Sequence, residues 1–320
     1  MPKRRILVLT ADRAERGLLE PIMKELEMRD DVEAKWGELR NNYEWGTADN
    51  IYKLRDLFHS FRTNPNDSGE EGKPDIIVCP TDRAEMVYVA AYAFHMGYVI
   101  AHFHAGNNPT NHPDDLNRKA ISTFSHIMFA NMDQHKRNLI YQGEEAWRIK
   151  VVGSTAFDHV DYDNSVTPKG AYTVVILHPD PASAENTKKD LDATLKYAQL
   201  SPKVVWIYPN KDKHREIITD FLERKDVAYM QPPVVTIHKN LPKGQYLDLL
   251  KNCADAVGNS SSFYYELPVL NPKALMKQIG ERNKGLVVPP TVPGGSKRIA
   301  EILATIPLDE KLRKKWCPNG

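Results

Sequence analysis

Short apolar runs without polar alternation recur along the chain, and segments with helical spacing separate them. Arg5–Thr10 (RILVLT), Asp75–Cys79 (DIIVC) and Tyr98–His102 are apolar runs of this kind, whereas Gly17–Met28 and Ala84–Met96 have helical spacing. Unbroken apolar strands are typical of parallel sheets that are buried on both faces, and such strands are joined by crossover helices. The pattern therefore predicts an α/β fold with doubly wound sheets, in which ligands bind at the carboxyl ends of the strands.

The alternation is interrupted once by a polar stretch, residues 161–170, which ends in Pro and Gly and is expected to be a linker. The chain has 320 residues, enough for two domains of ordinary size. We expect one α/β domain over residues 1–164 and a second over residues 165–305, with residues 306–320 packing back on the first. Two such domains facing each other would leave a cleft lined by strand ends.

The overall charge gives no indication of nucleic-acid binding, because the formal net charge is only +1. Basic clusters at residues 2–5, 211–215 and 310–315 are interpreted as solvated surface. Cys79, Cys253 and Cys317 have no paired spacing, which favours a reducing, cytoplasmic compartment. No apolar run approaches the roughly 20 residues of a membrane span, so no membrane partner is expected.

A candidate phosphate site follows the apolar run Ala254–Val257, which breaks at a Gly-Asn pair into three serines. The free N–H groups of a helix start, together with the hydroxyls of Ser260, Ser261 and Ser262, form a site that suits phosphate oxygens. Glu266 lies one turn further on, where a carboxylate would repel phosphate and would suit the hydroxyls of a ribose instead. The alternative is that the serines are an ordinary helix cap.

Other charged side chains follow neighbouring strand ends. Arg282 follows the run at Ala274-Leu275, and a guanidinium there is suitable counter-charge for a diphosphate. His178 ends the first strand of the second domain. Arg13 and Arg83 follow two strands of the first domain, where the alternatives are capping or solvated residues.

The segment HFHAGNN after the third strand turns tightly at Gly106 and carries His102, His104 and Asn107. A His-x-His pair raises the question of a metal, but no third ligand is in register, so no metal is expected. Asp82 follows the strand Asp75–Cys79, and the alternative for it is a helix start. Asp82 and His104 are candidates for acid–base chemistry.

Taken together and in order, these motifs resemble those of the UDP-N-acetylglucosamine 2-epimerases, and the resemblance is closest to the hydrolysing branch that feeds sialic-acid synthesis. It covers nearly the whole chain. The matching segments are TADRAERGLLEPI, PTDRAE, HFHAG followed by HPDDLNRKAIS, the strand end at His178, GNSSSFYYE and IGERNKG. The resemblance implies two Rossmann-like domains in the GT-B arrangement, with a UDP-binding C-terminal domain and neither a metal nor a nicotinamide cofactor.

The resemblance also implies roles for individual residues. The residues implied to hold the UDP moiety are Arg13, Arg83, His178, Ser260, Ser261, Glu266 and Arg282. Those implied to lie at or next to the reacting sugar are Asp82, Asp114, Asp115 and Arg118. These roles agree with the interpretation from the residues themselves, in which cations and N–H donors suit a diphosphate and carboxylates suit proton transfer.

The sequence departs from the family pattern where the acid–base groups are expected. Family members carry glutamate in place of His104, of Asn107 or of both, and here both glutamates are absent. We therefore expect a glycosyltransferase that uses a UDP-N-acetylglucosamine-type donor, with Asp82 or His104 deprotonating an acceptor hydroxyl. The alternatives are the family's own 2-epimerase activity, hydrolysing or not, and a UDP-sugar sensor without catalysis.

The acceptor of such a transferase is not determined by the sequence. A modified base in DNA is one candidate, which the local basic clusters would suit although the net charge does not argue for it. The UDP-sugar is the expected substrate, no separate cofactor is expected, and a homodimer is left open.

Overall fold

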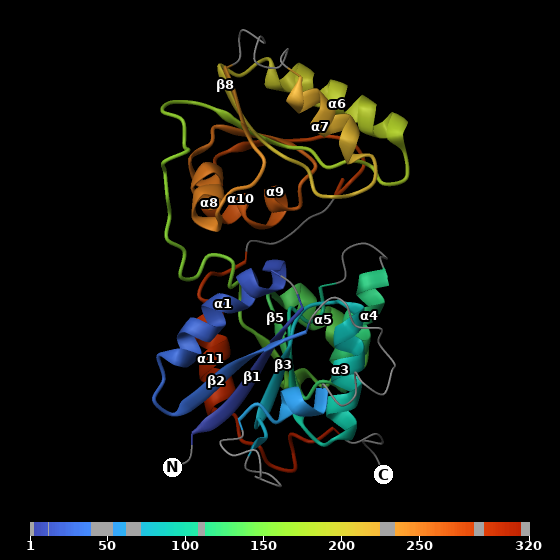
Figure 1. Cartoon of the computed structure of the whole chain (residues 1–320), viewed down its shortest axis with the longest axis vertical. Helices are drawn as coiled ribbons and strands as arrows, with labels where there is room; N and C mark the ends of the chain where they lie inside the picture. The colour runs from blue at the N-terminus through green and yellow to red at the C-terminus, as the bar shows by residue number, and fades with distance from the viewer. Residues whose placement is uncertain are drawn as a thin grey trace. The chain divides into compact units, whose positions relative to one another are not determined.

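The computed structural model describes residues 3–11, 13–39, 54–61, 72–107, 113–224, 234–284 and 291–314 (Figure 1). The chain divides into two compact units. Unit 1 comprises Met1–His159 together with Thr291–Gly320, and unit 2 comprises Val160–Pro290. Each unit is an α/β body with its own parallel sheet, so the expected fold class is confirmed.

Unit 1 is built on a six-stranded parallel sheet with the strand order β2-β1-β3-β4-β5-β6. The strands are β1 (Arg4–Thr10), β2 (Val32–Glu38), β3 (Ile76–Cys79), β4 (Val99–Phe103), β5 (Ile127–Ala130) and β6 (Ile149–Val151). The helices are α1 (Arg13–Glu27), α3 (Ala84–His95), α4 (Pro113–Phe124), α5 (Asp133–Tyr141), the 3-10 turn η2 (Ala146–Arg148) and α11 (Gly295–Thr305).

The unbroken apolar sequence of β1 is explained by burial on both faces of the sheet. Ile6 and Val8 are fully buried in a core that includes residues of α1 and α11. Leu7 and Leu9 are fully buried in a separate core on the other face, with residues of α3. Neither face of the strand meets water, so polar alternation is absent.

The return of the chain to unit 1 begins earlier than we expected. Ile299 and Leu303 of α11 are buried in the same core as Ile6, and α11 packs beside α1 (Figure 1). The transfer therefore takes place at Thr291 and not at residue 306, because the apolar face of α11 is buried against unit 1. Residues 315–320 lie outside the described part of the chain.

The end of the described chain is attached to the rest of unit 1 by the side chains of two cations, the buried Arg148 and the partly buried Lys314. The guanidinium of Arg148 donates to the carbonyl oxygen of Leu312 at 2.6 Å. Lys314 forms an ion pair with Glu144 at 2.6 Å and donates to the carbonyl oxygens of Ser122 and Thr123, in the last turn of α4. This segment therefore holds the carboxyl end of α4 in place.

Unit 2 contains a five-stranded parallel sheet with the order β11-β10-β7-β8-β9. The strands are β7 (Thr173–Ile176), β8 (Lys203–Ile207), β9 (Val234–His238), β10 (Asp255–Gly258) and β11 (Leu275–Gln278). The helices are α6 (Ala184–Ala198), α7 (Arg215–Glu223), α8 (Lys243–Asn252), α9 (Ser262–Tyr265) and α10 (Leu267–Leu270). Among the described residues of both units, no helix combines the length and apolar character needed to cross a bilayer.

The two edge strands of unit 2 were the least visible in the sequence. We did not predict β9, whose side chains are all at least partly exposed, and we expected β11 to cover only two residues. An edge strand packs on fewer neighbours and therefore needs fewer apolar residues. The central strands β7 and β10 agree with the apolar runs that predicted them.

The start of α11 depends on one carboxylate. Asp158 accepts hydrogen bonds from the backbone N–H groups of Gly294 and Ser296, at 2.7 and 2.8 Å, and from the Ser296 hydroxyl at 2.7 Å.

We expect Asp158→Ala to lower the free energy of unfolding by about 2–4 kcal/mol, because three charge-assisted bonds are lost. Urea denaturation measures the change. The control Asp161→Ala removes an exposed carboxylate and should change stability by less than about 0.5 kcal/mol; equal effects of the two variants would contradict the assignment.

Candidate functional site

In unit 2, the carboxyl ends of β7 and β10 are locked together by one side-chain amide. Asn259 accepts a hydrogen bond from the backbone N–H of His178 at 2.7 Å and donates to the carbonyl oxygen of His178 at 2.9 Å. Gly258 has φ 141°, and a Cβ at this position would collide with the backbone of Ile176. The close approach of the two strands therefore requires glycine, and Asn259 fixes His178 beside the serine segment.

The imidazole of His178 is held as a hydrogen-bond donor. Its Nδ1 accepts from the backbone N–H of Asn210 at 3.1 Å, so the neutral ring carries its proton on Nε2. Burial lowers the pKa of His178 to about 4, and the nearby Arg282 acts in the same direction against Asp212. At neutral pH this ring is uncharged and presents an N–H group.

The three serines occupy different environments at the turn before α9. Ser261 has helical backbone angles and its side chain does not cap the helix, which is only one turn long. The Ser260 hydroxyl accepts a long hydrogen bond of 3.4 Å from the backbone N–H of Ser262. Within the described part of the chain, the backbone N–H groups of Ser260 and Ser261 donate to no protein acceptor. The turn thus offers two backbone donors next to His178.

Arg282 lies on the neighbouring strand end, after β11. Its guanidinium donates to the Asp212 carboxylate at 2.8 Å and to the carbonyl oxygen of Pro179 at 3.3 Å. The Gln278 side chain donates to the carbonyl oxygen of Arg282 at 2.6 Å, and the Tyr264 hydroxyl donates to Gln278 at 2.6 Å. The guanidinium is about one-third exposed, so an anion can reach it.

Glu266 directly follows α9, and the pKa of its carboxyl group is strongly raised. Burial raises the pKa of Glu266 to about 7, although a hydrogen bond from Ser262 and the charge of Lys243 oppose the shift. Tyr246 lies next to this carboxyl group, and burial raises the pKa of its phenol. The Ser262 hydroxyl contacts both Glu266 and Tyr246. These groups form a polar patch that adjoins a cavity.

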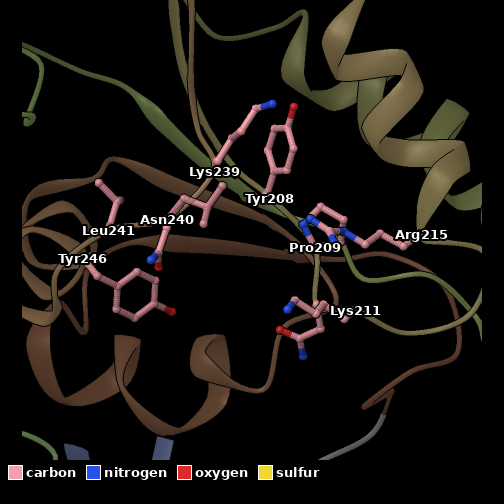
Figure 2. Close-up of a pocket in the computed structure, with 10 residues that line it drawn as sticks. Tyr208, Pro209, Lys211, Arg215, Lys239, Asn240, Leu241 and Tyr246 are labelled. Carbon is pink, nitrogen blue, oxygen red and sulfur yellow. The ribbon is translucent and has the colours of Figure 1, made fainter. Parts of the chain in front are cut away.

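That cavity has a volume of about 520 Å³ and opens at the ends of β8 and β9 and the start of α8 (Figure 2). It is lined by Ile207, Tyr208, Pro209, Asn210, Lys211, Arg215, Lys239, Asn240, Leu241 and Tyr246. Asn210 connects the cavity to His178, and Tyr246 connects it to Glu266. Two cations of the basic cluster that we interpreted as solvated surface, Lys211 and Arg215, line the cavity instead.

In unit 1, Asp82 and Arg118 form a partly buried ion pair at the carboxyl edge of the sheet. Burial raises the pKa of Asp82; Arg118 opposes the rise, whereas Asp114 and Asp115 add to it. Arg118 also donates to the carbonyl oxygen of Asn107 and is only 6% exposed. The structure thus brings together four predicted residues, with Arg118, Asp114 and Asp115 all close enough to act on Asp82.

Asp114 and Asp115 are the second and third residues of α4, and Arg118 follows one turn later on the same helix. Asp114 is exposed and Asp115 is buried. Carboxylate side chains are common in the first turn of a helix, where the backbone N–H groups are unpaired. Helix α4 therefore places two carboxylic acids, Asp114 and Asp115, near Asp82, together with the Arg118 guanidinium that forms an ion pair with it.

His104 follows β4 in a left-handed backbone conformation, with φ 62°. Its Nε2 lies 2.7 Å from the side-chain nitrogen of Asn131, which follows β5. Burial lowers the pKa of His104 to about 3, and the charge of Arg118 lowers it further. Asn131 was not predicted as a site residue, because an asparagine after a strand is usually a turn residue.

His102 is completely buried, and both of its ring nitrogens have hydrogen-bond partners within the protein, as expected for a histidine with a structural role. Its ring nitrogens lie 2.9 Å from the Ser122 hydroxyl and 2.8 Å from the carbonyl oxygen of Thr81. Thr81 in turn donates to Glu15 at 2.9 Å. Among the described residues, no three His, Cys, Asp or Glu side chains are grouped so that they could hold a metal ion.

The remaining predicted UDP ligands, Arg13 and Arg83, belong to unit 1. Arg83 pairs with Glu85 at 2.7 Å. Arg13 is the first residue of α1, and its side chain lies outside the described part of the structure. The structure therefore groups His178, the serines, Glu266 and Arg282 in unit 2, and Asp82, His104, Asp114, Asp115 and Arg118 in unit 1.

The chain is similar to known proteins over most of its length. A family model described as UDP-N-acetylglucosamine 2-epimerase matches residues 48–306. The UDP-N,N'-diacetylbacillosamine 2-epimerase (hydrolyzing) of Legionella pneumophila is 25% identical over 84% of this chain and 79% of its own length. The GDP/UDP-N,N'-diacetylbacillosamine 2-epimerase (hydrolyzing) of Campylobacter jejuni is 27% identical over 69% of this chain, and the match spans 60% of that relative.

Solved structures share the fold. The UDP complex of S. aureus MnaA has a TM-score of 0.66 at 18% identity, and covers 98% of this chain and 90% of that chain. The UDP-GlcNAc 2-epimerase from Methanocaldococcus jannaschii has a TM-score of 0.64 at 19% identity, and covers 93% of this chain and 91% of that chain. These likenesses confirm two Rossmann-like units of the GT-B class.

Our expectation of a glycosyltransferase is wrong. The family model and the curated relatives are epimerases, and none of these findings supports a sugar acceptor or DNA as a partner. The expectation depended on the two missing glutamates, yet Asp114 and Asp115 already lie close enough to Asp82 to raise its pKa. With a family match that covers most of the chain, the protein belongs to the UDP-N-acetylglucosamine 2-epimerase family.

Proposed function

We propose that the protein is a hydrolysing 2-epimerase of UDP-linked N-acetylated sugars. The observation that carries the proposal is the Asp82 carboxyl group, whose pKa is raised by burial and by two neighbouring acids while Arg118 keeps it paired. A carboxylate of raised basicity suits the removal of a weakly acidic proton from carbon. The two hydrolysing relatives, from Legionella and Campylobacter, support this assignment.

Unit 2 supplies the groups that would hold UDP. The Nε2–H of His178, the backbone N–H groups of Ser260 and Ser261, and the guanidinium of Arg282 are donors for the diphosphate oxygens. Glu266 would accept hydrogen bonds from the ribose hydroxyls. The adjoining cavity is large enough for the base. The solved complex of S. aureus MnaA with UDP, which shares this fold, supports the proposal.

The proposed reaction is an elimination followed by the addition of water. Asp82 takes the proton from C2 of the sugar, the C1–O bond to UDP breaks, and UDP leaves with that electron pair. A protonated Asp114 or Asp115 then delivers its proton to C2 of the resulting glycal on the opposite face, and water adds at C1. The proton that this water loses passes to the carboxylate just formed, and Asp82 returns the C2 proton to solvent. The products are UDP and the free sugar inverted at C2. Preorganised donors around the diphosphate stabilise the departing UDP.

The deciding experiment is incubation with UDP-N-acetylglucosamine, or with UDP-N,N'-diacetylbacillosamine, in heavy water without an acceptor. We expect release of UDP and of the C2-inverted free sugar, with deuterium at C2, as measured by NMR and mass spectrometry. Asp82→Asn should lower the rate by on the order of 10²-fold or more, because the base is lost. The control Asp133→Asn changes an exposed carboxylate of unit 1 and should retain full rate. Intact UDP-sugar without C2 exchange would falsify the epimerase assignment.

Binding of UDP tests the phosphate site separately from catalysis. We expect Arg282→Ala to weaken UDP binding by roughly 1.5–3 kcal/mol, as the loss of a charge-assisted phosphate contact does. Calorimetry measures the affinity. The control Lys284→Ala removes a neighbouring cation that is paired with Glu281 and well exposed, and should change the affinity little. Equal losses in both variants would indicate a general charge effect and not a phosphate contact.

The raised pKa of Glu266 predicts a pH dependence of binding. If ribose hydroxyls donate to ionised Glu266, a UDP-sugar should bind more weakly as the pH falls through about 7, the pKa of this carboxyl group. A UDP-sugar is the right probe, because its diphosphate is esterified at both ends and does not titrate near neutral pH. Affinity is measured in the Asp82→Asn background to prevent turnover. Adding Glu266→Gln should remove the pH dependence; a slope that persists in this variant would exclude Glu266 as its source.

A further inference from the structure

The contact between His104 and Asn131 assigns a role to His104 that differs from that of a base. The argument rests on the proposed function for the identity of the substrate. The side-chain nitrogen of Asn131 lies 2.7 Å from Nε2 of His104. In the orientation that the structure gives to the Asn131 amide, its nitrogen faces the ring, and an amide nitrogen only donates, so Nε2 accepts this bond with its lone pair. The neutral ring therefore carries its proton on Nδ1.

The surroundings of His104 keep the ring neutral. The guanidinium of Arg118 on α4 acts on it, and the rings of His135 on α5 and His102 on β4 lie nearby. The ring also packs against Phe103 in a tilted arrangement, with 4.6 Å between the ring centres. Burial and these cationic or titratable neighbours all lower the pKa of His104, to about 3. The imidazole is consequently uncharged throughout the pH range of ordinary enzyme activity.

A ring in this state cannot accept a further proton without losing its bond to Asn131. Its remaining polar atom, Nδ1, has no hydrogen-bond partner among the described residues, and it is not among their completely buried polar atoms without a partner. The left-handed backbone at His104 is sparsely populated by residues other than glycine, and such strain is retained where it directs a functional side chain. Nδ1–H is thus a free donor.

We propose that His104 acts as a neutral hydrogen-bond donor, through Nδ1–H, to an oxygen atom of the bound sugar, and that Asn131 is the positioning residue that fixes this tautomer. The roles of the two candidate bases are then separated by their environments. Asp82 is the acceptor of the C2 proton, and His104 polarises an oxygen of the same sugar without changing its own protonation state.

The first test examines the resting protein and does not depend on turnover. Long-range ¹H–¹⁵N NMR of protein labelled at histidine distinguishes the two tautomers, and the His104→Gln variant identifies the His104 signals. We expect the Nδ1–H tautomer between pH 6 and pH 8. A signal from the Nε2–H tautomer would mean that the Asn131 amide is rotated so that its oxygen accepts from the ring, and would overturn the proposal.

The second test is Asn131→Asp, measured as the ratio of variant to wild-type turnover across the pH range. A carboxylate accepts a proton, so the neutral ring moves its proton to Nε2 and loses the Nδ1–H donor; we expect the ratio to fall about tenfold or more at pH 8. The carboxylate also raises the pKa of His104. As the pH falls through this raised pKa, the imidazolium regains Nδ1–H and the ratio should rise.

The sign of this change separates the two roles of His104. If His104 were the base, raising its pKa would protonate more of it at low pH, and the ratio would fall as the pH falls. The matched control is Gln134→Glu, which adds a carboxylate on the exposed face of α5 and should leave the ratio near one at every pH. A wild-type protein that turns over neither UDP-sugar would reject the proposed function, whereas the NMR result would still decide the tautomer.

Discussion

The guanidinium of Arg118 controls the electrostatics of the site in unit 1. This buried cation pairs with Asp82, holds the carbonyl oxygen of Asn107, and lowers the pKa of both His104 and His135. Without it, Asp82 would lie among two other acids with no counter-charge, and burial would favour its protonated form. One cation therefore pairs with the carboxylate that is proposed to take a proton, and adds to the burial that keeps the neighbouring rings from taking one.

In unit 2, the groups proposed to bind the anion are mostly neutral hydrogen-bond donors, and Arg282 is the charged member. The amide of Asn259 fixes the backbone at His178, and the peptide N–H of Asn210 fixes its ring tautomer. The backbone carbonyl oxygen of Arg282 accepts a hydrogen bond from Gln278, whose side chain is in turn bonded by the Tyr264 hydroxyl. The Nε2–H donor of His178 is thus oriented before any ligand arrives, which lowers the entropy cost of binding.

The sequence predicted the fold class and most of the strand ends, because unbroken apolar runs leave few alternatives to a parallel sheet. It did not predict the partners that orient the site, such as Asn131 and Asn259. Asn259 is 81 residues from His178 along the chain, and an isolated asparagine carries no pattern that would show such a pairing. The function was misjudged for a related reason, since we gave weight to two absent glutamates and not to the carboxylates that α4 brings to Asp82.

The path of the chain through unit 1 has a consequence for how the protein forms during synthesis. Helix α11, which completes one face of the first sheet, is translated only after all of unit 2. On the ribosome, the core around Ile6 and Leu303 stays open while unit 2, which is continuous in sequence, can already close. Unit 1 begins to be synthesised first but is completed last. Until α11 is made, the apolar face that it covers is exposed, and the nascent chain needs protection from aggregation there.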